Sequence, residues 1–228
     1  RDLRLLLKGR FKFAPRLSYS IGYMYDAPND VWRFRQTGLM IDLNELQGNL
    51  FIGRTKEGFS TNKLMVGYHG WANERAAAND AFLPILADGV KWTGWGFGGK
   101  LVYNFGWFIG SFTNQPYVKN DHQFVLRTVW LPLAGHETPS VLHVALETRY
   151  GSSRNGTLQF KSKPESFAAQ TNAIDTGAFP AAGSTMLGVE TYYRPGSFML
   201  GMEYFLNQVS SDTSGDPSGN ESGVESGR

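Results

Sequence analysis

The opening stretch of the chain alternates between two kinds of side chain. Every second position is apolar or glycine: Leu3, Leu5, Leu7, Gly9, Phe11 and Phe13. The interleaved positions are basic apart from Leu6: Arg4, Lys8, Arg10 and Lys12. A period of two is that of a β-strand with two different faces. A row of cations opposite a row of apolar residues is difficult to place in a soluble core. It suits a barrel wall, with lipid outside and a watery, cationic lumen inside.

The composition narrows the class of protein. Charged residues make up only 18% of the 228 residues and aromatic residues 14%, with 27 glycines. This balance fits outer-membrane barrels, in which aromatic girdles mark the two membrane interfaces. It also fits a β-sandwich or a carbohydrate-binding module, so composition alone does not separate these classes. The chain has no cysteine, which excludes disulfides, zinc–thiolate sites and cysteine nucleophiles.

The sequence shows neither a transmembrane helix nor a signal peptide. No run approaches 18 apolar residues, so the sequence predicts no transmembrane helix. It also lacks a secretory signal peptide. If the protein is exported, we therefore expect this chain to be a mature form or a fragment.

Alternating segments follow one another with turns at regular spacing, which is typical of an up-and-down antiparallel sheet. The predicted strands cover residues 3–14, 16–25, 31–42, 47–55, 92–104, 107–113, 122–132, 140–150, 157–163, 185–194 and 198–208. Residues 104–106 are predicted to form a turn. The predicted fold class is all-β, a transmembrane antiparallel up-and-down barrel of the porin type. About eleven strands are expected here, each close to the roughly 9–11 residues needed to cross a bilayer. Porin barrels of bacteria normally have an even number of strands, so a partial barrel over residues 1–209 is expected.

Three segments do not alternate. Loops are predicted at about 56–91 and 164–183, and loops of this length are usually functional. In a barrel, a loop that folds inward would narrow the pore. Residues 210–228 are rich in serine, glycine and acidic residues, so this tail is predicted to be disordered.

No motif indicates catalysis. Residues 94–100 match G-x-G-x-x-G and nearly match a phosphate-binding loop, but no helix is expected to follow, so we interpret these glycines as strand positions beside large aromatic residues. The four histidines show no metal-ligand spacing, and neither HExxH nor GxSxG occurs. The sequence therefore predicts a protein that is not an enzyme and has no cofactor or metal.

The basic alternation is the pattern that carries chemistry. It could form the solvated outer face of a soluble sheet whose other face packs a core. It could instead form an anion path, because fixed cations in a narrow lumen raise the local anion concentration. A nucleic-acid surface is not favoured, since the aromatic residues lie opposite the cations and could not stack on the bases.

Three stretches resemble the phosphate-selective porin O and P family of Gram-negative outer membranes. The first is FIGRTKEGFS at 51–60, with ERA at 74–76. The second is FKSKPE at 160–165, with DTG at 175–177. The third is LGVE at 187–190, with FMLGMEY at 198–204. These motifs occur in the family's order and together span roughly residues 1–209.

The resemblance implies a trimeric outer-membrane barrel of sixteen strands with inward-folded loops and an arginine-lined channel. Its implied partners are inorganic phosphate or other small anions, outer-membrane lipid and lipopolysaccharide, and two further copies of the chain. The resulting hypothesis is an anion-selective diffusion channel for phosphate or polyphosphate. We expect the channel lining to consist of Arg4, Lys8, Arg10, Lys12, Arg16, Arg33, Arg35, Arg54, Lys56, Arg75, Lys161 and Lys163. Among these, Arg54, Lys56 and Arg75 are expected at or near the constriction.

Other functions remain open at this level. The main alternative is a soluble β-sandwich that binds a ligand or carbohydrate on an aromatic platform, which would require one apolar face to be buried. A structural or adhesin role is another. An enzyme within a barrel is the least favoured, since no catalytic triad can be identified.

Overall fold

The structure of the protein is a computed structural model. It describes residues 2–26, 30–65, 75–109, 120–135, 138–165, 169 and 171–211, and all structural statements refer to these residues. The predicted tail falls almost wholly outside them, since only Ser210 and Ser211 are described, and Ser210 ends a strand.

Strands account for most of the described chain. Their bounds are β1 (Asp2–Phe11), β2 (Ala14–Asp26), β3 (Val31–Phe34), β4 (Thr37–Leu43), β5 (Gly48–Thr55), β6 (Ala87–Gly96), β7 (Leu101–Ile109), β8 (Asn120–Gly135), β9 (Thr138–Ser153), β10 (Thr157–Leu158), β11 (Lys161–Ser162), β12 (Ile174–Asp175), β13 (Phe179–Pro180), β14 (Gly183–Pro195) and β15 (Leu200–Ser210). The helical elements are α1 (Thr61–Leu64), α2 (Ala77–Phe82) and two 3₁₀ turns, η2 (Asn44–Leu46) and η4 (Phe97–Gly99). In the described part of the chain, no helix has the length and apolar character needed to cross a membrane.

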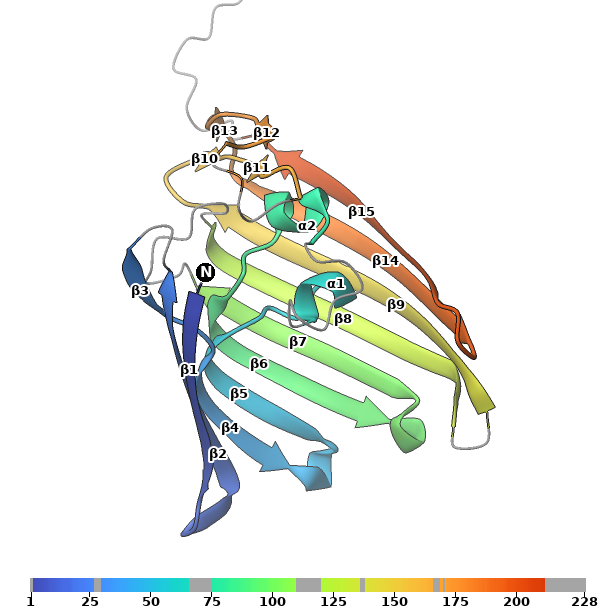
Figure 1. Ribbon diagram of the computed structural model, residues 1–228. Coiled ribbons are helices and arrows are strands. Elements are labelled where there is room, and N and C mark those ends of the chain that lie inside the picture. Colours follow the sequence, from blue (N-terminus) through green and yellow to red (C-terminus); the bar gives the residue numbers. More distant parts are fainter. Residues whose placement is uncertain are drawn as a thin grey trace, which may run out of the picture.

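The described residues form one large antiparallel sheet of 11 strands, which confirms the predicted all-β class and antiparallel arrangement. Its order is β1-β2-β4-β5-β6-β7-β8-β9-β14-β15, with β3 also paired to β2. Figure 1 shows this sheet as a curved wall, with α1 and α2 in front of it. Within the described residues β1 and β15 do not pair with each other, so the sheet is open at these two edges.

The register divides the side chains between two faces, because directly paired residues in neighbouring strands point to the same side. One row that crosses ten strands consists of Arg10, Ser18, Met40, Phe51, Lys91, Gly106, Val125, Arg149, Met186 and Asn207. Phe108 and Met186, on this side, contact the segment between β5 and β6. We call this side the inner face.

The adjacent row belongs to the opposite, outer face and is apolar or aromatic. It consists of Tyr19, Leu39, Ile52, Val90, Trp107, Phe124 and Tyr150. Large apolar side chains on this face stay exposed, including Leu146 at 66% and Leu187 at 50%. On the inner face of the same strands, Glu147 is 1% exposed and Glu190 0%. The usual placement of apolar and charged residues in a soluble sheet is therefore reversed.

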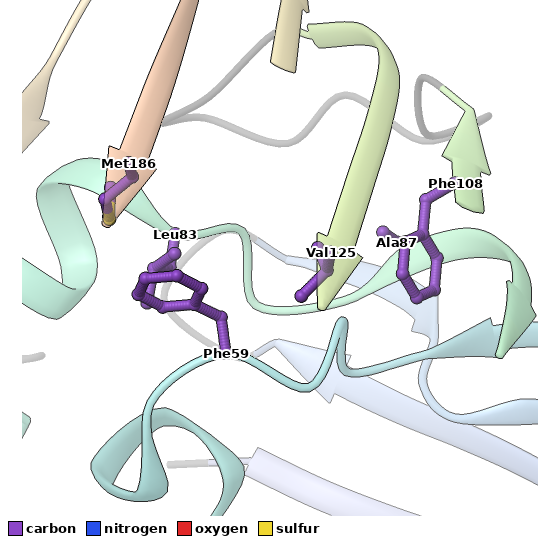
Figure 2. Close-up of a cluster of buried hydrophobic side chains, with 6 residues drawn as sticks. All are labelled: Phe59, Leu83, Ala87, Phe108, Val125 and Met186. Atoms are coloured by element: carbon purple, nitrogen blue, oxygen red, sulfur yellow. The ribbon is translucent and has the colours of Figure 1, made fainter. Parts of the chain in front are cut away.

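A compact apolar cluster joins the inner face to the segment that follows β5. We name residues 56–86 the inward loop, of which 56–65 and 75–86 are described. Its Phe59 and Leu83, each 2% exposed, pack with Val125 and Met186 of the wall, and Phe108 and Ala87 complete the cluster (Figure 2). The loop thus packs against the inner face, and it ends at β6, which begins at Ala87, rather than at residue 91.

A second small layer lies where residues 157–163 were predicted to add a strand to the wall, and that prediction is wrong. Residues 157–158 form β10, which pairs with β13, and residues 161–162 form β11, which pairs with β12. The alternating apolar residues Leu158 and Phe160 pack instead with Ala181, Phe82 and Phe179. Alternating apolar residues would also fit a strand of a lipid-facing wall. At Leu158 and Phe160 they instead pack the second loop against the inward loop.

Two other boundaries also differ from prediction. Residues 31–42 form two strands, because the backbone N–H of Arg35 donates to Gly22 and that of Gly22 to the Thr37 hydroxyl, which interrupts the ladder. The hairpin turn lies at residues 97–100, not 104–106. There Gly98 and Gly99 adopt φ of 65° and 85° in the 3₁₀ turn η4, a backbone conformation that favours glycine. Gly94 and Gly96 of the G-x-G-x-x-G motif lie in β6, in agreement with their interpretation as strand positions.

Gly53 offers a test of backbone strain in the wall. It has φ of 133°, and a Cβ there would lie 2.4 Å from the Thr37 carbonyl oxygen. We expect Gly53→Ala to lower the free energy of unfolding by about 1–3 kcal/mol. Denaturant unfolding followed by tryptophan fluorescence measures this loss. The matched variant Gly96→Ala should be nearly neutral, since a Cβ there meets nothing within 4 Å. Equal losses of unfolding free energy in the two variants would contradict the strain assigned to a side chain at Gly53.

Candidate functional site

Charged side chains of the inner face pair with each other and with the inward loop. Arg127 donates from Nε to Glu147 Oε1 at 2.5 Å and from Nη2 to Glu190 Oε2 at 2.7 Å. Arg149 donates from Nε to Glu57 Oε2 of the loop at 2.6 Å. Its Nη2 also donates to Gln123 at 3.1 Å. Buried charges are tolerated only when paired in this way, so the loop and the wall neutralise one another.

A group of cations lies beside this docked loop. We call Arg35, Lys56, Arg75 and Lys91 the cation cluster. Arg35 lies between β3 and β4, Lys56 and Arg75 lie in the two described parts of the loop, and Lys91 lies in β6. Lys56 Nζ donates to the carbonyl oxygens of Leu64 and Met65, both at 2.6 Å. Arg75 Nη2 donates to the same Met65 oxygen at 3.0 Å, and Lys91 Nζ donates to the Lys56 carbonyl at 3.1 Å.

The electrostatics of Lys56 show how closely these cations gather. Burial, followed by repulsion from Arg75, Arg35, Lys63 and Lys91, lowers the pKa of Lys56 to about 7. The strongest charges acting on it are therefore all positive. Lys56, Arg75 and Lys91 each donate to a backbone carbonyl oxygen. Such a concentration of positive charge favours an anion.

Lys63, which lies next to this cluster, forms an ion pair with Asp80. Its Nζ donates to the Asn79 carbonyl and to Asp80 Oδ1, both at 3.0 Å, and so ties α1 to α2. Burial lowers the pKa of Lys63 to about 8, while Asp80 opposes this shift. Lys63 therefore serves the internal structure of the loop.

The predicted lining residues of the first two strands lie on the inner face, at positions set by the register. Arg4, Lys8 and Arg10 pair with positions 24, 20 and 18 of β2. Arg10 also forms an ion pair with Asp42 at 2.9 Å. Lys12 lies in the exposed hairpin turn after β1. Arg16 forms an ion pair with Glu45 of the β4–β5 turn, at 2.5 Å.

The other predicted residues divide into three groups. Arg33, on the inner face of β3, lies 3.3 Å from Asp26, whereas Arg35 joins the cation cluster. Arg54 is 7% exposed and donates from Nε and Nη2 to both oxygens of Asp88 at 2.8 and 2.5 Å, so its charge is neutralised at the end of β5. Lys161 and Lys163 belong to β11 and the residue after it, on the second loop, outside the large sheet.

Sequence reasoning missed Lys91 and gave no role to the inner glutamates. Lys91 is the single charge at the centre of the aromatic stretch VKWTGW, so it does not form part of a basic row. Only the register places it on the inner face, where it pairs with Phe51 and Gly106. Likewise, only the fold brings Arg149 to Glu57 and Glu147 to Ser60 of the loop.

The site shows no arrangement for a metal ion. Among the described residues, no three His, Cys, Asp or Glu side chains gather as metal ligands would. Comparison of the sequence with protein-family models gives no match, and comparison with curated proteins gives no significant match either.

The titration of Lys56 provides a direct test of the cation cluster. We expect its reactivity toward acetic anhydride to rise with a midpoint near pH 7, because the neutral amine is the reactive form. Competitive labelling read by mass spectrometry measures this midpoint. Arg75→Met should raise it, since Arg75 is the largest of the charge contributions.

The exposed Lys12 supplies the control for this measurement. Lys12→Met removes a cation from the hairpin turn after β1 and should leave the Lys56 midpoint unchanged. A Lys56 midpoint near that of an ordinary lysine in the unaltered protein would show that the cluster does not form.

Proposed function

We propose that the protein is an outer-membrane porin of Gram-negative bacteria that conducts small anions, phosphate among them. The observation that carries this proposal is the cation cluster on the inner side of the sheet, where Lys56 is surrounded by positive charge. Transport would be passive, with no covalent step. Cations in series let an anion enter and leave again, because each site binds only weakly.

The two faces of the sheet support a membrane setting. The outer face is apolar and aromatic, with Phe105, Trp107 and Leu126 exposed to between 42% and 53%. The inner face holds the charges. An apolar band outside and a polar interior is the pattern of transmembrane barrels. Closure of the wall into a barrel, and the trimer that the family resemblance implies, are parts of this proposal.

The position of the inward loop suggests a route for the anion. The loop is bonded to β8, β9, β14 and β15 through Arg127, Glu147, Glu190 and Glu203. The inward loop therefore covers the part of the inner face formed by β8, β9, β14 and β15. The remaining side, toward β1–β3, carries the basic row of β1 together with Arg33 and Arg35. We propose that anions pass between the loop and this basic wall.

The soluble β-sandwich is less well supported. It requires an apolar face buried against a second sheet of comparable size. The other sheets in the described residues are two-stranded, with two residues in each strand. They pack on the loops and α2 rather than on the outer face.

Reversal potentials in planar bilayers test the proposal on the full protein. In a potassium chloride gradient we expect anion preference, and added phosphate should reduce the chloride current. Arg75→Gln should lower the anion-to-cation permeability ratio by about fivefold. This factor corresponds to the interaction of roughly 1 kcal/mol between one fixed charge and an ion about 4 Å away in water. Lys100→Gln, in the exposed β6–β7 turn, should leave the ratio unchanged.

Two results would count against the proposal. Channels with no anion preference would contradict the role of the cation cluster while keeping the barrel. A protein that stays in solution without detergent and forms no channel would contradict the porin itself and favour the binding module.

A further inference from the structure

Three glutamates on adjacent strands bind the first turn of α1. Ser60 donates from its backbone N–H to Glu147 Oε1 at 2.9 Å and from Oγ to Glu203 Oε2 at 2.6 Å. Thr61 donates from both its N–H and its Oγ1 to Glu190, the latter at 2.8 Å. We call Glu147, Glu190 and Glu203 the glutamate clamp.

The clamp is itself fixed by the wall. Tyr192 donates from its hydroxyl to Glu203 Oε1 at 2.5 Å, and Asn62 of α1 donates from its N–H to the same oxygen at 2.8 Å. Arg127 joins Glu147 to Glu190, and His143 Nε2 lies 3.0 Å from Glu190 Oε2. A buried network in which each member has several partners holds one geometry.

The shape of the wall also favours this docking. At Gly188, a Cβ would lie 2.8 Å from Glu147 Oε2 and 2.9 Å from the Phe59 ring. Glycine at this position therefore leaves room for both the clamp and the loop. Phe59 in turn precedes the first clamped residue, Ser60, so the apolar cluster and the clamp hold the same point of the loop.

The opposite end of α1 holds the cation cluster. The helix has four residues, so its two ends are about 6 Å apart. The carbonyl oxygens of Leu64 and Met65 at that end accept from Lys56, and Met65 also accepts from Arg75. Any movement of the clamped end must therefore displace the oxygens that orient these two cations.

We propose that Glu147, Glu190 and Glu203 are positioning residues for anion selectivity, which act by clamping α1 so that its last carbonyls hold Lys56 and Arg75 beside Arg35 and Lys91. This inference rests on the proposed function, because selectivity is the property it explains. The glutamates themselves are covered by the loop and do not touch the anion. Their effect on selectivity is the reverse of what their charge alone would produce.

That reversal of sign makes the inference testable. In Glu190→Gln/Glu203→Gln, two negative charges leave the inner face, so simple electrostatics predicts a stronger anion preference. The clamp predicts a weaker one. A glutamine has one carbonyl oxygen and cannot accept from as many donors as a carboxylate. We expect the anion-to-cation permeability ratio to fall at least about fivefold, equivalent to roughly 1 kcal/mol.

Limited trypsin digestion gives a second readout that does not depend on ion transport. Lys63 is 4% exposed in the clamped loop, so the bond after it should resist cleavage in the unaltered protein. We expect rapid cleavage there in the double variant. The single variant Glu203→Gln, on the edge strand β15, provides a milder change if the double variant does not fold. Glu45→Gln, in the exposed β4–β5 turn, is the matched control for the digestion and should leave the bond after Lys63 resistant.

The outcomes separate the inference from the proposed function. An anion-selective protein whose Gln variants keep or increase their anion preference would overturn the clamp's role. Resistance to trypsin in the variants would do the same, since the loop would then be held without the glutamates. A protein without anion preference before any substitution would overturn the proposed function and this positioning role with it, whereas the trypsin result would still decide whether the clamp holds the loop.

Discussion

The structure depends on a constraint set by its inner face, where charged side chains are buried. Glu147, Arg149 and Glu190 have almost no exposed surface, and unpaired charges in such positions would be very costly. Arg127 pairs with two of the wall's own carboxylates, and residues 57–62 of the inward loop supply further partners to Glu147, Arg149 and Glu203. The loop is thus a structural necessity for the wall as well as a feature within its hollow.

This docking divides the inner face into two regions of opposite charge. Carboxylates of β9, β14 and β15 lie under the loop, where backbone N–H groups and Arg127 balance them. Cations of β1 and β3 lie on the other side, together with Arg35. The cation cluster lies where the loop meets this basic side.

Local alternation made the wall predictable from sequence. The two-residue period separated Leu3, Leu5 and Leu7 from Arg4, Lys8 and Arg10, and the register places these two sets on opposite faces.

Prediction was wrong where tertiary contacts decide. Leu158 and Phe160 alternate as a wall strand would, yet they pack on α2 and β13. The break at Arg35 follows from a backbone hydrogen bond to Gly22, which has no local signature. Three of the four residues of the cation cluster were predicted as lining residues, whereas Lys91 and the glutamate clamp acquire their roles from partners far away in the sequence.

That distance also has a consequence for the order in which the molecule assembles. Ser60 and Glu203 are 143 residues apart in the sequence, whereas short turns join β1 to β2, β4 to β5 and β6 to β7. Contacts between distant residues form late in folding, because the loop-closure entropy must be met first. We therefore expect the strands of the large sheet to pair before the inward loop packs against the inner face. Under the proposed function, the part of the molecule that carries the cation cluster would be the last to form, so a nascent chain would pass through a state that lacks anion selectivity.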